Sequence, residues 1–276
     1  MTSPRLSSLH VYPVKSAQGA APERADVEPW GLAGDRRWVV VNGDGRAVTQ
    51  REAPRMTQVV AVPQADGGIV LRAPGTAPLT VAVPTGGGTS RVWIFSTPVE
   101  AAGAAPEAAA WWSAFLGADL RLFHLDDPAG GRPIPPHDNR GRDDGRVSFA
   151  DSHPLLLTST ASLAALNRLV ARGDHAGDGP LPMNRFRPNM VVDGTGPWVE
   201  DDWRRVRVGE VVMRVVGPCA RCVITTTDQE HGTRGKEPLR TLARHRRFGG
   251  GLMFGQNLVP ESGGTLRVGD TFSVVE

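Results

Sequence analysis

The sequence is poor in cysteine and tyrosine and has no long apolar run. Only two cysteines occur among 276 residues, which argues against a disulfide-stapled domain and agrees with a reducing compartment. No apolar stretch has the ~20 residues needed to cross a bilayer, and the N-terminus lacks the apolar core of a secretory signal. The formal net charge of +2 is too small to indicate a nucleic-acid or membrane partner. We therefore expect a cytoplasmic protein with neither kind of partner.

Glycine and proline are abundant instead, with 33 and 23 residues, and they separate many short segments of alternating or β-branched residues. This spacing predicts a small barrel or sandwich, with strands at 6–12, 25–28, 57–62, 68–71, 79–83 and 91–95. Helical patterns occur at 106–116, at 159–171 and, with basic character, at 238–247. The predicted fold class is therefore mainly β with a few helices.

A polar segment at residues 126–146 interrupts these patterns. It is rich in Pro, Gly, Asp and Arg and has no periodicity, which is typical of a mobile linker or an active-site loop. We place the domain boundary there, which gives one domain at 1–125 and a second at 126–276. No internal repeat of fixed period is present.

The two cysteines lie close together in the second domain. Cys219 and Cys222 are separated by two residues, one of which is Arg221. Residues 211–216 alternate and residues 223–227 are β-branched, so the pair is expected at a turn between two strands. A neighbouring guanidinium favours the ionised thiol, and a thiolate is a soft ligand that suits a soft metal.

Four interpretations of this cysteine pair remain open on spacing alone. The first is a structural disulfide, and the second is a redox pair of the thioredoxin kind, which would need a helix rather than β-branched residues after it. The third is a zinc site with His231 and His245 as the nearest further ligands, although their spacing fits no zinc-finger pattern. In the fourth, one cysteine ligates the metal of a cofactor and the other is structural.

The residues around the pair resemble a known family. The segment 219–228, then Gly232, 236–239 and 241–242, is similar to the signature of the molybdenum cofactor sulfurase C-terminal (MOSC) domain family. The closest resemblance is to the branch of the mitochondrial amidoxime-reducing component and its bacterial relatives. Further motifs follow in the order of that family and extend the resemblance over nearly the whole chain, at 12–16, 34–38, 148–154, 186–189 and 254–256.

This resemblance implies an N-terminal MOSC-type β-barrel and a C-terminal MOSC β-barrel core that together hold one molybdenum–molybdopterin cofactor. The second cysteine of the pair, Cys222, would be the metal ligand. The implied cofactor-binding residues are Lys15, Ser16, Arg36, Ser152, His153, Arg187, Asn189, Arg221, Cys222 and Asn257. Arginine suits the phosphate of such a cofactor because it binds phosphate in a bidentate manner.

Several of these residues also have simpler interpretations. Lys15, at the end of a strand, is equally a solvated charge, and Arg187 fits a surface ion pair. His153 replaces a hydroxyl residue of the family, so its contact would come from the backbone. Asn257 stands where animal members often carry tyrosine. Trp111 and Trp112 are expected in the core rather than on a stacking surface.

The resemblance also implies an activity, the reduction of N-hydroxylated compounds such as amidoximes, hydroxylamines and N-hydroxy bases by oxygen removal at molybdenum. Cys222 and Asp228 are the candidate catalytic residues, the latter for proton handling or for orienting the turn. Electrons would come from a separate ferredoxin-like or flavin reductase, because no cysteines remain for a cluster. The basic stretch 240–247 either docks that partner or is a solvated face. The alternative is a cofactor carrier or sulfur-handling module without turnover.

Overall fold

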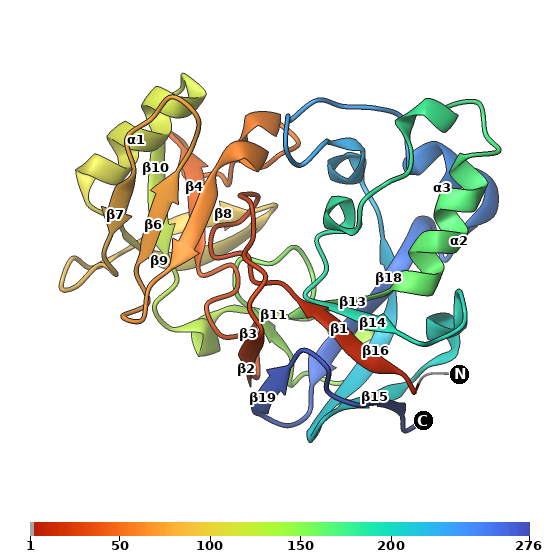
Figure 1. Ribbon diagram of the computed structural model, residues 1–276. Helices are drawn as coiled ribbons and strands as arrows, with labels where there is room; N and C mark the ends of the chain where they lie inside the picture. The colour runs from red at the N-terminus through yellow and green to blue at the C-terminus, as the bar shows by residue number, and fades with distance from the viewer. Residues whose placement is uncertain (1–2) are drawn as a thin grey trace.

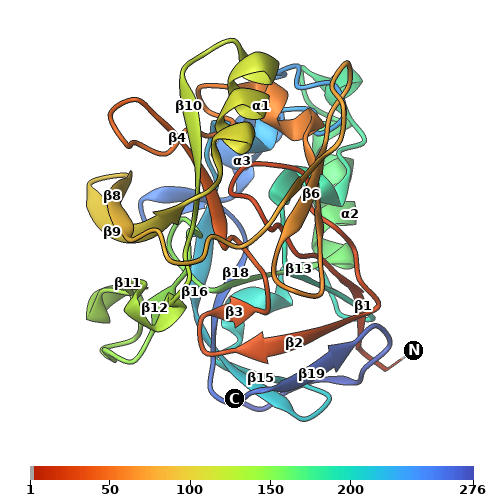
Figure 2. The same cartoon turned by 90° about the vertical axis from the view of Figure 1, so that its left-hand side faces the viewer.

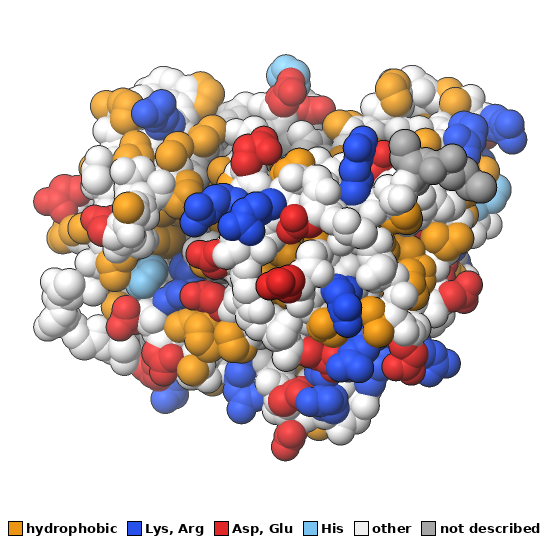
Figure 3. Space-filling view, turned by 60° about the horizontal axis from the view of Figure 1, so that its bottom comes forward, with side chains coloured by type: hydrophobic (Ala, Val, Ile, Leu, Met, Phe, Trp, Pro, Cys, Tyr) orange, Lys and Arg blue, Asp and Glu red, His pale blue; other side chains and the backbone are white. Residues whose placement is uncertain are grey.

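The computed structural model describes residues 3–276 and confirms a mainly β fold, with twenty strands, three α-helices and several short 3-10 turns. Figure 1 shows two bodies side by side, one built around the N-terminal strands and one around the C-terminal strands. On the face seen in Figure 3, basic and acidic side chains are interspersed without a large patch of one sign. Among residues 3–276, no helix is long and apolar enough to span a membrane.

The larger body is an eight-stranded sheet that closes on itself. Its path runs β1-β14-β13-β18-β16-β15-β20, and β17 adds to β18. The ends of the path meet because the Leu6 amide donates to the Asp270 carbonyl and the Phe272 amide to the Pro4 carbonyl, each at 2.9 Å. Closure leaves no exposed edge on this path. The strands are β1 (Arg5–Leu9), β13 (Leu155–Ser159), β14 (Met190–Asp193), β15 (Arg205–Val208), β16 (Val211–Ala220), β17 (Arg247–Phe248), β18 (Gly251–Pro260) and β20 (Phe272–Val274).

The inside of this barrel is the main apolar core of the second body. Side chains from nearly every strand meet there and are almost fully buried, among them Leu6, Leu157, Met190, Val215 and Leu258. Their burial is the dominant favourable term for closing the barrel. Two helices, α2 (Thr160–Val170) and α3 (Leu239–His245), pack on one side of it, as Figure 1 shows. Ser159, the first residue of the helical pattern at 159–171, is the N-cap of α2, and its hydroxyl accepts from the Ser162 amide.

The first part of the chain does not stay with the N-terminal body. Strand β1 pairs with β14, and β2 (Arg24–Glu28) lies between β3 (Gly31–Leu32) and β19 (Gly264–Arg267). Figure 2 shows β2 beside β19 at the base of the molecule. The division into 1–125 and 126–276 therefore remains a prediction about the sequence, since residues 5–32 share sheets with strands of the second half.

The N-terminal body contains two sheets and a helix. One sheet has the order β4-β10-β9-β8 and the other β5-β6-β7. Successive residues of β4 point to opposite faces, so Val39 and Val41 enter one apolar cluster and Trp38 and Val40 another. The strands are β4 (Trp38–Asn42), β5 (Val60–Pro63), β6 (Ile69–Arg72), β7 (Leu79–Val81), β8 (Thr89–Ile94), β9 (Thr97–Gly103) and β10 (Leu120–His124).

Helix α1 (Pro106–Leu116) covers the apolar cluster that contains Trp38 and Val40, and it has the predicted bounds. Trp112 is buried there as expected, together with Phe115, whereas Trp111 is only half-buried and packs against the same cluster. Gly117 ends the helix in the left-handed conformation, with φ of 71°. The remaining helical turns are η1 (Pro54–Gln58), η2 (Pro128–Gly130), η3 (Pro136–Asp138), η4 (Ala176–Asp178), η5 (Met183–Phe186), η6 (Val199–Asp202) and η7 (Val223–Thr226).

The polar segment at 126–146 is held against the barrel rather than free. It contains η2, η3 and β11 (Arg132–Pro133), and β11 pairs with β12 (Arg146–Val147). Arg140 donates from Nε to the Val215 carbonyl at 2.6 Å, and Arg214 pairs with Asp144 at 3.1 Å. These contacts connect the segment to β16, the strand that leads to the cysteines.

The prediction of a strand at 223–227 is wrong, because residues Val223–Thr226 form the 3-10 turn η7. The threonine hydroxyls supply the reason. Thr225 donates to the Cys222 carbonyl at 2.9 Å, and Thr226 donates to the Val223 carbonyl at 2.8 Å. Such local bonds offer the backbone an alternative to a sheet ladder. Cys219 therefore lies near the end of β16, and Cys222 lies immediately before a helical turn.

Candidate functional site

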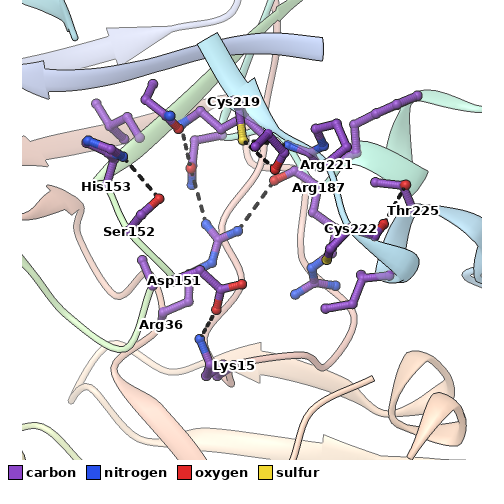
Figure 4. A pocket seen from close by; sticks show the side chains of 18 of the residues that line it. Lys15, Arg36, Asp151, Ser152, His153, Arg187, Cys219, Arg221, Cys222 and Thr225 are labelled. Carbon is purple, nitrogen blue, oxygen red and sulfur yellow. Dashed lines mark hydrogen bonds and ion pairs between the residues drawn. The ribbon is translucent and has the colours of Figure 1, made fainter. Parts of the chain in front are cut away.

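One cavity brings together residues from distant parts of the chain. Its volume is about 160 Å³, an order of magnitude more than the ~15 Å³ that a single water needs. All ten residues that the resemblance implies as cofactor-binding line it, and Asp151, Cys219 and Thr225 are further lining residues. Figure 4 shows the labelled side chains arranged around this space. Asp228 is not part of the lining.

Both cysteines reach the cavity as free thiols, Cys222 exposed and Cys219 half-buried. Their cationic neighbours differ from the expectation. Arg221 donates from Nη1 to the Cys219 Sγ at 2.9 Å rather than to Cys222. The guanidinium nearest Cys222 is that of Arg51, whose Nη2 lies 3.7 Å from Sγ. Each thiol thus has its own arginine, and the one at Cys222 comes from the N-terminal body.

The structure narrows the interpretations of the cysteine pair. The two thiols are not joined. Between residues 3 and 276, no group of three or more His, Cys, Asp or Glu side chains is placed to share a metal, so a zinc set with His231 or His245 does not form. A helical turn does follow Cys222, but it has only four residues, whereas the thioredoxin-like motif belongs to a longer strand–helix unit.

Lys15 is almost fully buried, which excludes the solvated interpretation. Its Nζ donates to the Phe149 carbonyl at 2.7 Å and forms an ion pair with Asp151. Arg51 contacts the other carboxylate oxygen of Asp151 at 2.8 Å. Burial alone would raise the pKa of Asp151, but the charges of Lys15 and Arg51 outweigh it and hold that pKa well below its usual range. Asp151 is therefore an anion that holds two cations at the cavity.

A second cationic group surrounds the ring of Tyr12. The guanidinium carbons of Arg36 and Arg187 each lie 4.3 Å from its centroid, within the range of cation–π attraction. Arg36 pairs with Asp35 at 2.6 Å and donates to Asn189 Oδ1 at 3.2 Å. Arg187 donates to the Ala17 carbonyl at 2.8 Å. Burial lowers the pKa of Arg187 to about 10, so this side chain stays charged at neutral pH.

The backbone is strained at the same place. Six non-glycine residues between positions 3 and 276 have positive φ, and three of them line this cavity, namely Ser16 at 67°, Arg36 at 48° and Arg187 at 52°. Such conformations cost ~1–3 kcal/mol each and gather at functional sites. Here they direct one hydroxyl and two guanidinium groups toward the same space.

The charges in the cavity do not balance. Lys15 pairs with Asp151 and Arg36 with Asp35, but Arg187 and Arg221 have no carboxylate partner among the described residues. Arg221 also has a buried Nε with no hydrogen-bond partner. Keeping unpaired cations out of water is unfavourable unless an anion compensates them. The cavity therefore has the charge and donor chemistry for an anionic ligand with phosphate-like oxygens.

The remaining lining residues supply neutral polar groups. His153 contacts the Ser152 hydroxyl at 3.0 Å through Nδ1 and the Asp138 carbonyl at 2.9 Å through Nε2. Asn257 donates to the Pro218 carbonyl at 3.4 Å, a long bond. These side chains come from the segment before β13 and from β18, so they meet only in the folded chain.

Asp228 lies behind the cysteine loop. Its Oδ1 accepts from the amides of Glu230 at 3.0 Å and His231 at 2.8 Å, and its Oδ2 pairs with Arg185 at 3.2 Å. Burial raises the pKa of this carboxyl, but the two amides, His231 and Arg185 outweigh burial and keep the pKa below its usual range. These contacts hold the turn that follows η7, and the two predicted roles of Asp228 stay predictions.

The basic stretch at 240–247 is largely satisfied within the chain. Arg240 and Arg244 both pair with Asp174, and Arg246 pairs with Asp201 at 2.6 Å. These internal pairs reduce the charge available to an acidic partner on α3.

Sequence reasoning missed Asp151 and Arg51. Asp151 lies inside the 148–154 motif, so the motif located it without indicating its role. Arg51 follows β4 in the N-terminal body, 171 residues from Cys222. Only the packing of the two bodies places it beside that thiol.

Comparison with known proteins identifies the family of this chain. Residues 3–119 match the model described as the MOSC N-terminal beta barrel domain, and residues 144–273 match the MOSC domain. Mitochondrial amidoxime-reducing component 1 of Homo sapiens is 31% identical over 96% of this chain and 81% of its own length. Mitochondrial amidoxime reducing component 2 of Homo sapiens is 30% identical over 96% of this chain and 82% of its own length. Molybdenum cofactor sulfurase of Oryza sativa subsp. japonica is 28% identical over 91% of this chain and 32% of its own length.

Proposed function

Since this chain belongs to the MOSC-domain family, in the branch of the mitochondrial amidoxime-reducing components, we propose that it is a molybdenum-cofactor-dependent oxidoreductase that reduces N-hydroxylated compounds. One observation carries the proposal. An exposed thiol and two guanidinium groups that pair with no carboxylate in the described part of the chain line the same cavity, together with every other residue expected to hold the cofactor. This combination matches an anionic cofactor that carries a soft metal.

The residues divide by the part of the cofactor they suit. Arg187 and Arg221 would bind its phosphate, because each has donors free of any carboxylate. Asn189 and Asn257 would meet the pterin edges, while Lys15, Ser16, Arg36, Ser152 and His153 would supply further donors. Cys222 would bind the metal through its thiolate, with Arg51 beside it. When bound, the cofactor supplies two-electron redox chemistry, and the chain positions it.

The proposed reaction converts an N-hydroxylated compound and two protons, with two electrons, into the reduced nitrogen compound and water. The N–O bond breaks, nitrogen is reduced, and the oxygen leaves in water. We propose a separate ferredoxin-like or flavin reductase as electron donor in the cytoplasm, because two cysteines are too few to hold an iron–sulfur cluster by four thiolates. Protons reach the site from solvent, since Cys222 is exposed.

The test uses protein produced in a host that makes the cofactor. We expect molybdenum near one equivalent per chain, the fluorescence of oxidised pterin after release, and reduction of benzamidoxime with dithionite-reduced methyl viologen as donor. Bound cofactor without turnover toward benzamidoxime or 6-hydroxylaminopurine would identify a carrier or sulfur-handling module instead. Absence of both molybdenum and pterin would reject either function.

Asp228 provides a separate prediction, because its two proposed roles respond differently to substitution. Asp228→Asn keeps an oxygen for the turn amides and should retain kcat/KM within about threefold, with an unchanged pH profile between about pH 6 and 8. The native carboxyl is already ionised there, since its pKa lies below its usual range. Asp228→Ala loses both turn bonds and should lower stability by ~1–3 kcal/mol, measured by thermal denaturation. An inactive, stable and cofactor-loaded Asn variant would instead show that Asp228 transfers a proton.

A further inference from the structure

Phe95 is an exposed aromatic side chain close to the proposed metal ligand. It lies in the hairpin turn between β8 and β9, and 54% of its surface is exposed, the largest fraction for any large apolar side chain between residues 3 and 276. Its φ of 55° is in the left-handed region, which bulky residues avoid. The two-residue hairpin loop at 95–96 itself requires a positive φ, so the position of the exposed ring, rather than its backbone conformation, needs an explanation.

The position of Phe95 connects it to the cavity. The Arg51 guanidinium carbon lies 5.2 Å from its ring centroid, and the Lys15 Nζ lies 5.8 Å from it. Both cations hold Asp151, which lines the cavity, and Arg51 also lies 3.7 Å from the Cys222 Sγ. The ring is therefore separated from the thiol by a single side chain. Phe95 is not among the residues that line the cavity, and Asp151, which lines it, is part-exposed, so the ring lies outside the cavity on the side of Lys15 and Arg51.

We propose that Phe95 is a specificity-determining residue, a stacking surface for the ring of an aromatic N-hydroxylated substrate whose N–O group enters the cavity. The inference rests on the proposed reductase function and narrows its substrate class. Aromatic pairs prefer stacked or edge-to-face contact at centroid distances of about 4.5–7 Å. A ring bound on Phe95 would leave its hydroxylated nitrogen free to extend past Arg51 toward Cys222.

The charge around the rim restricts the class further. Lys15, Arg51, Arg187 and Arg221 line or border the cavity, whereas Asp151 is the carboxylate among its lining residues. A cationic substrate would meet like charge there, which disfavours binding. The expected substrates are therefore neutral aromatic compounds, such as benzamidoxime, rather than aliphatic or permanently cationic ones.

The experiment compares benzamidoxime with acetamidoxime, which lacks the ring, on cofactor-loaded protein with dithionite-reduced methyl viologen as donor. The small donor removes any effect on the docking of a protein partner. In the native protein, kcat/KM should favour benzamidoxime. In Phe95→Ala this preference should fall about three- to tenfold, mainly through KM for benzamidoxime, as expected from loss of one aromatic pair. Phe95→Tyr should keep the preference of the native protein for benzamidoxime, whereas Phe95→Leu should lose it as Phe95→Ala does.

A matched control and a binding measurement separate the outcomes. Phe248 is another exposed phenylalanine, with 40% of its surface exposed and its ring centroid 4.8 Å from the Arg246 guanidinium carbon. Phe248→Ala should leave the preference for benzamidoxime over acetamidoxime unchanged. Saturation-transfer NMR on the oxidised loaded protein should show contact with the benzamidoxime ring that Phe95→Ala removes. An unchanged preference in Phe95→Ala, or an equal loss for both substrates, would overturn the inference while leaving the reductase function intact. Failure of the native protein to reduce either compound would instead count against the proposed function.

Discussion

Replacing Cys222 with serine is expected to abolish reduction of benzamidoxime, by about a thousandfold or more, and to remove most of the bound molybdenum. Cys222 presents an exposed thiol to the cavity at the start of η7, with Arg51 beside it. A serine hydroxyl is a hard ligand that stays protonated at neutral pH, so it replaces a thiolate poorly at a soft metal. The measurements are turnover with a chemical donor and metal content per chain.

Cys219 supplies the matched control. Its Sγ accepts from Arg221 at 2.9 Å and it is only half-buried, so the structure places both thiols at the cavity and does not distinguish them by position alone. Cys219→Ser keeps an acceptor for Arg221 and should retain activity and molybdenum within about threefold. If Cys219→Ser removed the molybdenum and Cys222→Ser retained it, Cys219 rather than Cys222 would be the metal ligand.

Replacing Arg187 with methionine is expected to weaken cofactor retention about a hundredfold without unfolding the chain. Arg187 is a buried cation that pairs with no carboxylate within residues 3–276. Charge-assisted hydrogen bonds contribute ~1.5–3 kcal/mol each, and a hundredfold change corresponds to ~2.7 kcal/mol. Methionine keeps the apolar stem near Tyr12 but removes the charge. Without cofactor, loss of an uncompensated charge should leave the melting temperature unchanged or higher.

Arg187→Lys separates charge from geometry at the same position. Lysine keeps the positive charge but loses the planar fork that binds phosphate in a bidentate manner, so we expect a smaller loss, about tenfold. Pterin fluorescence and molybdenum content after dialysis measure retention, and thermal denaturation of cofactor-free protein measures stability. Full cofactor content in the methionine variant, or a large loss of stability without cofactor, would show that Arg187 is part of the scaffold rather than a ligand-binding residue.

Local patterns in the sequence were sufficient for much of the fold. The helical pattern at 106–116 has the observed bounds of α1, and the pattern at 159–171 begins at the N-cap of α2, because helix propensity and capping depend on residues within one or two turns. The same local reasoning failed at 223–227. There β-branching suggested a strand, while the hydroxyls of Thr225 and Thr226 bond to nearby carbonyls and stabilise a helical turn.

The motifs of the sequence also named ten of the residues that line the cavity, and they assigned the chain to its family. What they did not give were the partners of those residues. The pairing of β1 with β14, the ion pairs of Asp151 with Lys15 and Arg51, and the contact of Arg51 with Cys222 join residues 100 to about 190 positions apart. No local propensity encodes such contacts, because they arise only when the barrel closes and the two bodies pack together. Tertiary structure alone therefore decided which cations are compensated, which thiol each arginine meets, and that the Phe95 ring lies against Arg51 and Lys15.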